Sequence, residues 1–212
     1  MYKPMPLDLH EKKFKNYWIS NSYKLNRRVE VVGQLDYEYF LLLEYDRNVI
    51  SYCERPLKSK VILNNKRVNI IPNFWIKQID TTEKYIFILY KPDFSKEIAI
   101  QKWCEINKKD FLILNKTEIR KNEELIRNIK LLQSFLINYQ GPAETEEFSI
   151  KRKLGNEKIL FYILLEKLSV NIDPIRARQL IIYYLFKGIL KSNLNKITDI
   201  SSLEVWKCLE EG

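Results

Sequence analysis

Two stretches, Val68–Trp75 (VNIIPNFW) and Tyr85–Pro92 (YIFILYKP), decide the fold of the first part of the chain. Both are apolar runs rich in residues that favour strands, and a short charged segment with turn-forming Asp and Thr separates them. They are therefore expected to form neighbouring antiparallel strands. Each run carries a polar residue near its end, Asn73 in the first and Lys91 in the second. A bend at the proline of the first run would bring both side chains to one cleft.

Further elements are predicted around these two strands. Apolar residues at helical spacing indicate helices, and short apolar runs bounded by turn residues indicate strands. The helices are expected at Leu35–Tyr45, Phe94–Ile106 and Glu123–Leu136, the strands at Val49–Cys53 and Phe111–Leu114, and a hairpin at Lys58–Leu63 with Arg67–Ile71. This order of helix, antiparallel strands, helix, strand and helix predicts a mixed α/β domain.

The segment Gln140–Ala143, which contains Gly-Pro, is the best linker in the chain and predicts a domain boundary. Beyond it, helices are expected at Asn156–Leu168, Pro174–Phe186 and Ser202–Leu209, with Asp173 as the N-cap of the second, and a hairpin at Ile189–Leu194 with Lys196–Ile200. Small helices with a terminal hairpin predict a winged-helix domain. The expected organisation is a basic and aromatic arm at 1–28, an α/β domain at 29–139 and a winged-helix-like domain at 140–212.

Composition narrows the possible chemistry. With 46% apolar and 30% charged residues the chain has a globular composition, and its formal net charge of +9 suits a polyanionic partner. No apolar run reaches the length of about 18 residues that a membrane span needs, so a cytoplasmic protein without a membrane partner is expected. The three cysteines are widely separated and the only histidine is His10. Disulfide frameworks, zinc clusters and histidine-dependent hydrolysis are therefore excluded, and any catalysis must use carboxylates, lysine and a hard metal ion.

Two groups of cations are candidates for DNA binding. Arg27 and Arg28 close the N-terminal arm, in which aromatic and basic residues alternate as in surfaces that stack bases and neutralise phosphates. The alternative is an arm that wraps over its own domain. Arg176 and Arg178 lie on the helix expected at Pro174–Phe186, which would be a recognition helix in a DNA-binding winged helix. Because that helix is otherwise apolar, contact with a protein is the alternative there.

A set of short motifs, in a fixed order along the chain, resembles the TnsA family of endonuclease subunits from heteromeric transposases. The resemblance covers residues 30–206. The motifs are Gly33-Gln34-Leu35-Asp36, Leu43-Glu44-Tyr45-Asp46, Val49, Arg55-Pro56, Pro72-Asn73-Phe74, Tyr90-Lys91-Pro92 and, near the C-terminus, Gly188–Leu194.

The resemblance implies a restriction-endonuclease-like domain followed by a winged-helix domain. Family members cut the non-transferred strand at transposon ends beside a DDE transposase subunit, and they contact an AAA+ regulator. Their carboxylates hold Mg²⁺, which activates water and stabilises the charge that develops on the phosphate. A nearby lysine orients the water or neutralises the phosphate.

Carried over residue by residue, the family site is impaired in this chain. Asp36 falls on the position of the first glutamate, and Asn73, a neutral side chain, falls on that of the principal metal-binding aspartate. Leu89 replaces a glutamate or glutamine, and Lys91 is intact. A single remaining carboxylate is expected to hold Mg²⁺ weakly. The other nearby carboxylates are not expected to replace the lost ligands; these are Glu38, Glu44 and Asp93.

The resemblance and the altered site together predict a TnsA-like subunit that assembles transposon-end complexes with little or no cleavage. An active magnesium-dependent endonuclease with a rearranged site is one alternative. A DNA-binding accessory protein without nuclease activity is the other.

Overall fold

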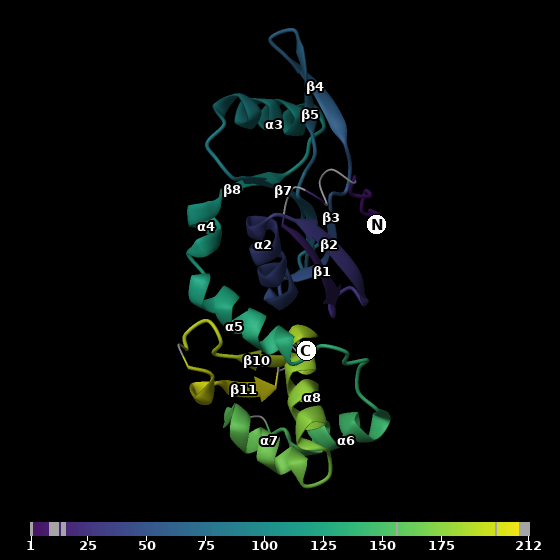
Figure 1. The fold of residues 1–212 in the computed structure, drawn as a ribbon, viewed down its shortest axis with the longest axis vertical. Coiled ribbons are helices and arrows are strands. Elements are labelled where there is room, and N and C mark those ends of the chain that lie inside the picture. The colour runs from purple at the N-terminus through teal and green to yellow at the C-terminus, as the bar shows by residue number, and fades with distance from the viewer. Residues whose placement is uncertain (1, 9–12, 14–15, 156, 198, 208–212) are drawn as a thin grey trace. The chain divides into compact units, whose positions relative to one another are not determined.

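The computed structural model describes residues 2–8, 13, 16–155, 157–197 and 199–207 and separates the chain into two compact units (Figure 1). Unit 1 is Met1–Lys121 and unit 2 is Asn122–Gly212. The division falls before the helix expected at Glu123–Leu136, whereas the Gly-Pro segment had suggested a boundary after it. Packing explains the difference, because Asn128 on this helix donates hydrogen bonds of 3.1 and 2.9 Å to the carbonyls of Leu194 and Ile197 in unit 2.

Unit 1 is built on a four-stranded sheet in the order β3-β6-β7-β8. Strands β3 (Val49–Glu54), β6 (Phe74–Gln78) and β7 (Glu83–Leu89) are antiparallel neighbours, and β8 (Phe111–Asn115) runs parallel to β7. A parallel pair needs a crossover, and α3 (Phe94–Ile106) provides it. The predicted mixed α/β class is therefore confirmed.

Alternate residues of the central strands face two different helices. On one face lies α2 (Gln34–Tyr45), whose Phe40 ring packs against that of Tyr52 in β3, with ring centroids 6.2 Å apart. On the other face lies α3, whose Trp103 contacts Phe87 of β7 with ring centroids 6.5 Å apart. The helix α4 (Lys116–Arg120) follows β8 and has a capping box at its start.

The stretch Val68–Trp75 is not one strand, so this prediction was wrong. Its first part belongs to β5 (Lys66–Ile70), which forms a separate two-stranded hairpin with β4 (Ser59–Leu63). The break around Pro72 follows because a proline cannot donate a ladder hydrogen bond, and β6 begins only at Phe74. The hairpin itself was predicted, and its Asn-Asn turn has the positive φ angles that suit a tight hairpin turn.

The expected N-terminal arm is largely part of unit 1. Strands β1 (Tyr17–Ser22) and β2 (Arg27–Val32) pair as an antiparallel hairpin. Trp18 of β1 stacks on Tyr37 of α2, with ring centroids 4.3 Å apart and an interplanar angle of 8°. The interpretation of an arm that wraps over its own domain is therefore correct for these residues, while His10 lies outside the described residues.

Unit 2 combines helices with a small antiparallel sheet of order β10-β11-β9. Its elements are α5 (Glu123–Ser134), α6 (Glu144–Lys153), β9 (Ile159–Leu160), α7 (Phe161–Ser169), α8 (Pro174–Phe186), β10 (Leu190–Ser192), the 3-10 helix η1 (Ile200–Ser202) and β11 (Glu204–Lys207). Leu180 and Ile181 of α8, together with Leu164 and Val205, are fully buried in its core. None of the helices in the described ranges has the length and apolar character that crossing a membrane requires.

Predictions for unit 2 were mixed. The helix Pro174–Phe186 and its N-cap are confirmed, because the Asp173 carboxylate accepts from two backbone amides of the first turn. The helix expected at Ser202–Leu209 is wrong, since this region contains β11, which pairs with β10. The hairpin therefore closes with β11 rather than with Lys196–Ile200. The helix expected from Asn156 begins at Phe161, because the residues before it pair with β11 as β9.

Candidate functional site

A cavity of about 680 Å³ in unit 1 lies where three segments meet. The first turn of α2 contributes Asp36, and the connection between β5 and β6 contributes Asn73. The end of β7 contributes Ile88, and the connection that follows it contributes Tyr90. The structure therefore brings together two of the residues that the sequence predicted as site residues, Asp36 and Asn73.

Asn73 is fixed at the break that follows Pro72. Its backbone amide donates to the Ile86 carbonyl at 2.8 Å, and its carbonyl accepts from the Arg55 amide at 2.9 Å. Its side-chain Oδ1 accepts from the backbone amide of Ile88 at 2.8 Å, which orients the amide group. The Nδ2 atom then donates to Asp36 Oδ1 at 2.7 Å.

The second oxygen of Asp36 is bonded to Tyr90. The Tyr90 hydroxyl donates to Asp36 Oδ2 at 2.7 Å and accepts from the backbone amides of Leu35 and Asp36 at 3.2 and 3.4 Å. It thus satisfies amides at the start of α2 that have no partner within the helix. Gly33 makes this approach possible, because a Cβ there would lie 1.9 Å from the Tyr90 oxygen and its φ is +105°.

Electrostatics keeps the hydroxyl of Tyr90 protonated. Burial, followed by the charge of Asp36 and the hydrogen bond to it, raises the pKa of Tyr90 above its ordinary value. The hydroxyl therefore stays protonated and remains a donor. Asp36 is only 8% exposed, and neutral donors occupy both of its oxygens.

Leu89 and Lys91 lie away from this cluster. Leu89 packs with Ala99 and Ile100 of α3 in the apolar core on the other side of the sheet. Lys91 lines a separate hollow of about 700 Å³ beside Glu97. Residues of a strand alternate between its faces, so Ile88 lines the cavity of Asp36 and Leu89 does not. Just beyond β7, Tyr90 lines this cavity and Lys91 does not. Sequence reasoning missed Tyr90, and this alternation was the signal that would have found it.

The carboxylates considered as replacement ligands have structural partners. Glu44 is 1% exposed and accepts from Ser22 Oγ at 2.7 Å and from the Tyr52 hydroxyl at 2.6 Å. Glu38 accepts hydrogen bonds of 3.0 and 2.9 Å from Arg120. Asp93 is the N-cap of α3 and accepts from the backbone amide of its third residue.

Arg27, a predicted DNA-binding residue, is engaged within its own unit. Its guanidinium donates to both oxygens of Glu54 at 2.7 and 2.6 Å. Glu54 lines the cavity but is only 2% exposed, and its hydrogen bond raises the pKa of Arg27. Arg28, the neighbouring candidate, is exposed on β2.

Arg176 is likewise engaged within unit 2. It donates to Glu146 at 2.9 and 2.7 Å and to the Gly141 carbonyl at 3.2 Å, and its guanidinium carbon lies 4.7 Å from the centre of the Tyr139 ring. Arg178 lies over the ring of another residue of unit 2, at 5.0 Å. These contacts favour a structural role for Arg176 over direct contact with DNA.

The Asp36 cluster does not fit Mg²⁺. Mg²⁺ is bound by oxygen ligands, among them one or two carboxylates, but here the Asn73 amide nitrogen and the Tyr90 hydroxyl donate hydrogen bonds to the two oxygens of the carboxylate. The hydrogen bonds instead join the start of α2 to the sheet.

In comparisons with known proteins, neither a family model nor a curated protein matches the chain.

Proposed function

We propose that the chain is a TnsA-like subunit of a heteromeric DNA transposase whose work is assembly at transposon ends, with little or no cleavage of its own. Its partners are the DNA of the ends, a DDE transposase subunit and an AAA+ regulator. The proposal rests on the motif resemblance, on the fold of both units and on the chemistry of the Asp36 cluster.

The fold is compatible with the two domains that the resemblance implies. Unit 1 runs in the order helix, antiparallel strands, helix and parallel strand, which supports a restriction-endonuclease-like domain. In unit 2 the helices α6, α7 and α8 precede the β10-β11 hairpin, and β9 adds a third strand, which supports a winged-helix domain.

One observation supports the part of the proposal that concerns the lack of cleavage. Both oxygens of Asp36 accept hydrogen bonds from neutral groups of Asn73 and Tyr90, at 2.7 Å each. A metal ion would have to displace both donors and would gain only one charged ligand. Loss of one such ligand costs several kcal/mol of transition-state stabilisation, about a thousandfold in rate. The frame of a nuclease site is thus kept as a structural junction.

A strand-specific nicking assay tests the proposal, with end DNA, the partner transposase and Mg²⁺. We expect the chain to shift the transposase–DNA complex to a larger species without a nick in the non-transferred strand. A nick that disappears with Asp36→Asn but persists with Lys108→Ala, an exposed control, would show an active endonuclease. DNA binding without any larger complex would identify a plain accessory protein.

Restoration of the site provides a second test. The triple variant Asn73→Asp, Ile88→Glu and Tyr90→Lys places two new carboxylates and a lysine on the face that meets Asp36, and magnesium binding by isothermal titration is the expected gain. The matched control, Asn73→Asp with Leu89→Glu, places its glutamate against α3 instead. Ile88 and Leu89 are equally buried, at 4% and 5% exposure, so both variants are expected to unfold at lower temperature than the wild type, and only the triple variant is expected to bind magnesium. Equal magnesium binding by both variants would contradict the assignment of faces.

A further inference from the structure

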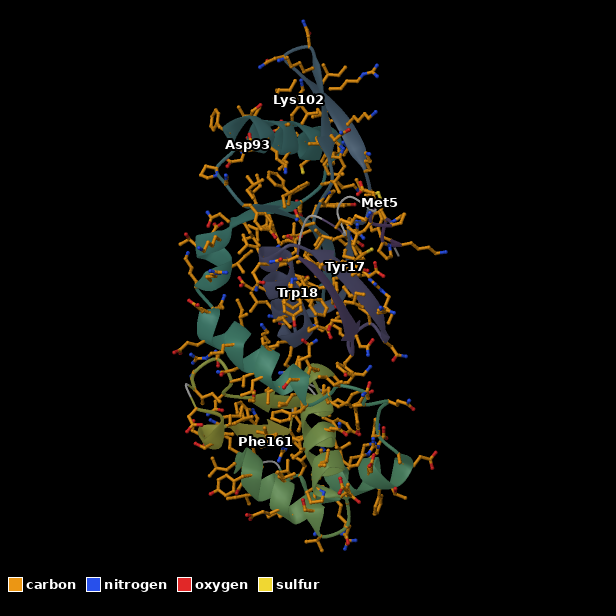
Figure 2. The ribbon with its side chains drawn as sticks, in the orientation of Figure 1. Met5, Tyr17, Trp18, Asp93, Lys102 and Phe161 are labelled. Carbon is orange, nitrogen blue, oxygen red and sulfur yellow. The ribbon has the colours of Figure 1, made fainter. Side chains whose placement is uncertain are left out.

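The charged residues of the β4-β5 hairpin are all cations. No Asp or Glu occurs between Glu54 and Asp80, while the hairpin and the residues next to it carry Lys58, Lys60, Lys66 and Arg67. All four side chains are exposed. The hairpin extends beyond α3, and side chains that end in nitrogen project from it (Figures 1 and 2).

One face of the hairpin anchors it to α3. Val61 and Ile70 are buried in the core that contains Trp103, and the Trp103 indole nitrogen donates to Ser59 Oγ at 2.9 Å. Lys102 of α3, labelled in Figure 2, donates to the Ile62 carbonyl at 3.0 Å. An isolated two-stranded hairpin is marginally stable, so this anchoring gives the outer face a fixed geometry.

The outer face presents cations, and no described carboxylate pairs with them. Lys60 is opposite Asn69, and Arg67 is opposite Ile62, which is 60% exposed. In the part of the chain that the structure describes, no ion pair involves the four hairpin cations, whereas Arg27, Arg120 and Arg176 each pair with a buried or nearly buried glutamate. The hairpin therefore keeps its charge available to an external anion.

We infer that this hairpin is a surface that binds duplex DNA, with Lys58, Lys60 and Arg67 of its outer face and Lys66 at its tip on phosphates. Five residues per strand give a ribbon about 17 Å long, and a two-stranded ribbon fits the major groove, which is about 12 Å wide. Cations on both edges of such a ribbon can reach the backbones that border the groove. The inference deepens the proposed function, because it names the surface that holds the transposon-end duplex.

Fluorescence anisotropy on a labelled duplex of about 30 base pairs, at several salt concentrations, tests this inference. The ribbon variant carries Lys60→Gln, Lys66→Gln and Arg67→Gln. The control variant carries Lys108→Gln, Lys116→Gln and Lys121→Gln, which are exposed in the same unit and lower the net charge equally.

Loss of three phosphate contacts should make the slope of log K (the association constant) against log salt less steep by about 2.7. Between about 50 and 200 mM salt, binding by the wild type should therefore weaken about 40-fold more than binding by the ribbon variant. The control variant is expected to keep the wild-type slope. An equal decrease in the steepness of the slope in both variants would show that only the net charge matters, and it would overturn the inference.

An unchanged slope in the ribbon variant also overturns it, but leaves the proposed function intact, since the larger transposase complex reports on that function separately. Stronger competition by an RNA duplex than by DNA would contradict the choice of partner. Should the triple variant not fold, Lys60→Gln and Arg67→Gln tested singly are each expected to lower the slope by about one. No change in either would overturn the inference as well.

Discussion

Replacing Asn73 by Asp tests the hydrogen-bonded cluster directly. The change puts an oxygen where Nδ2 now lies, 2.7 Å from Asp36 Oδ1. It removes a hydrogen bond to a charged group, which contributes about 1.5–3 kcal/mol. It also sets two carboxylates side by side, and their repulsion is about 4 kcal/mol at a separation of about 4 Å and an effective dielectric constant of about 20.

Proton uptake limits this cost, because two carboxylates in contact need not both stay ionised. Holding one of them protonated at about pH 7 costs at most about 4 kcal/mol. We therefore expect Asn73→Asp to lower the free energy of unfolding of unit 1 by about 3 kcal/mol at about pH 7. The loss is expected to shrink toward about pH 5, since the protonated pair of the folded state becomes favoured as pH falls.

Urea unfolding of wild type and variant across this pH range measures the effect. Asn73→Ala is the control: it also loses the hydrogen bonds of the amide but creates no charge, so its loss should not depend on pH. Unfolding of Asn73→Asp at the wild-type urea concentration, at about pH 7, would refute the hydrogen-bonded cluster. Stabilisation of the wild type by Mg²⁺, lost in Asp36→Asn, would refute the conclusion that the cluster does not hold metal.

Three further outcomes are expected. Arg27→Ala leaves the buried Glu54 carboxylate without its guanidinium and should lower the free energy of unfolding by about 3 kcal/mol in denaturant titrations. Arg176→Ala should lower the free energy of unfolding of unit 2 by about 1 kcal/mol in thermal unfolding. Both this variant and Arg178→Ala should leave the affinity for duplex DNA, measured by anisotropy, unchanged. Burial lowers the pKa of Lys24 to about 8, although nearby carboxylates oppose the shift. Between that value and its unfolded pKa the unfolded state binds more protons, so wild-type stability relative to Lys24→Met should rise by about 2 kcal/mol from about pH 7 to about pH 9.5.

Local signals in the sequence predicted most elements of unit 1 and the helix α8 of unit 2. Helical spacing located α2 and α3, and the Asp-Pro pair located the start of α8. Errors arose where pairing between distant segments decides the structure. The residues around Val205 have no strong preference by themselves, and they form a strand because Leu190–Ser192 and Ile159–Leu160 pair with them.

At the candidate site, too, pairing between distant segments decides the structure, here the direction of single side chains. Family positions pointed to Leu89 and Lys91, but a strand has a period of two, so a shift of one residue exchanges its two faces. The bonds from Asn73 to the backbone of Ile86 and Ile88 fix that register, and they place Tyr90 on the Asp36 carboxylate. Asn73, at the position where the resemblance implies a metal-binding aspartate, therefore also aligns the strand whose tyrosine donates to the other oxygen of Asp36. Asn73 and Tyr90 thus both belong to the junction around Asp36, and the proposed restoration of magnesium binding therefore changes Asn73, Ile88 and Tyr90 together.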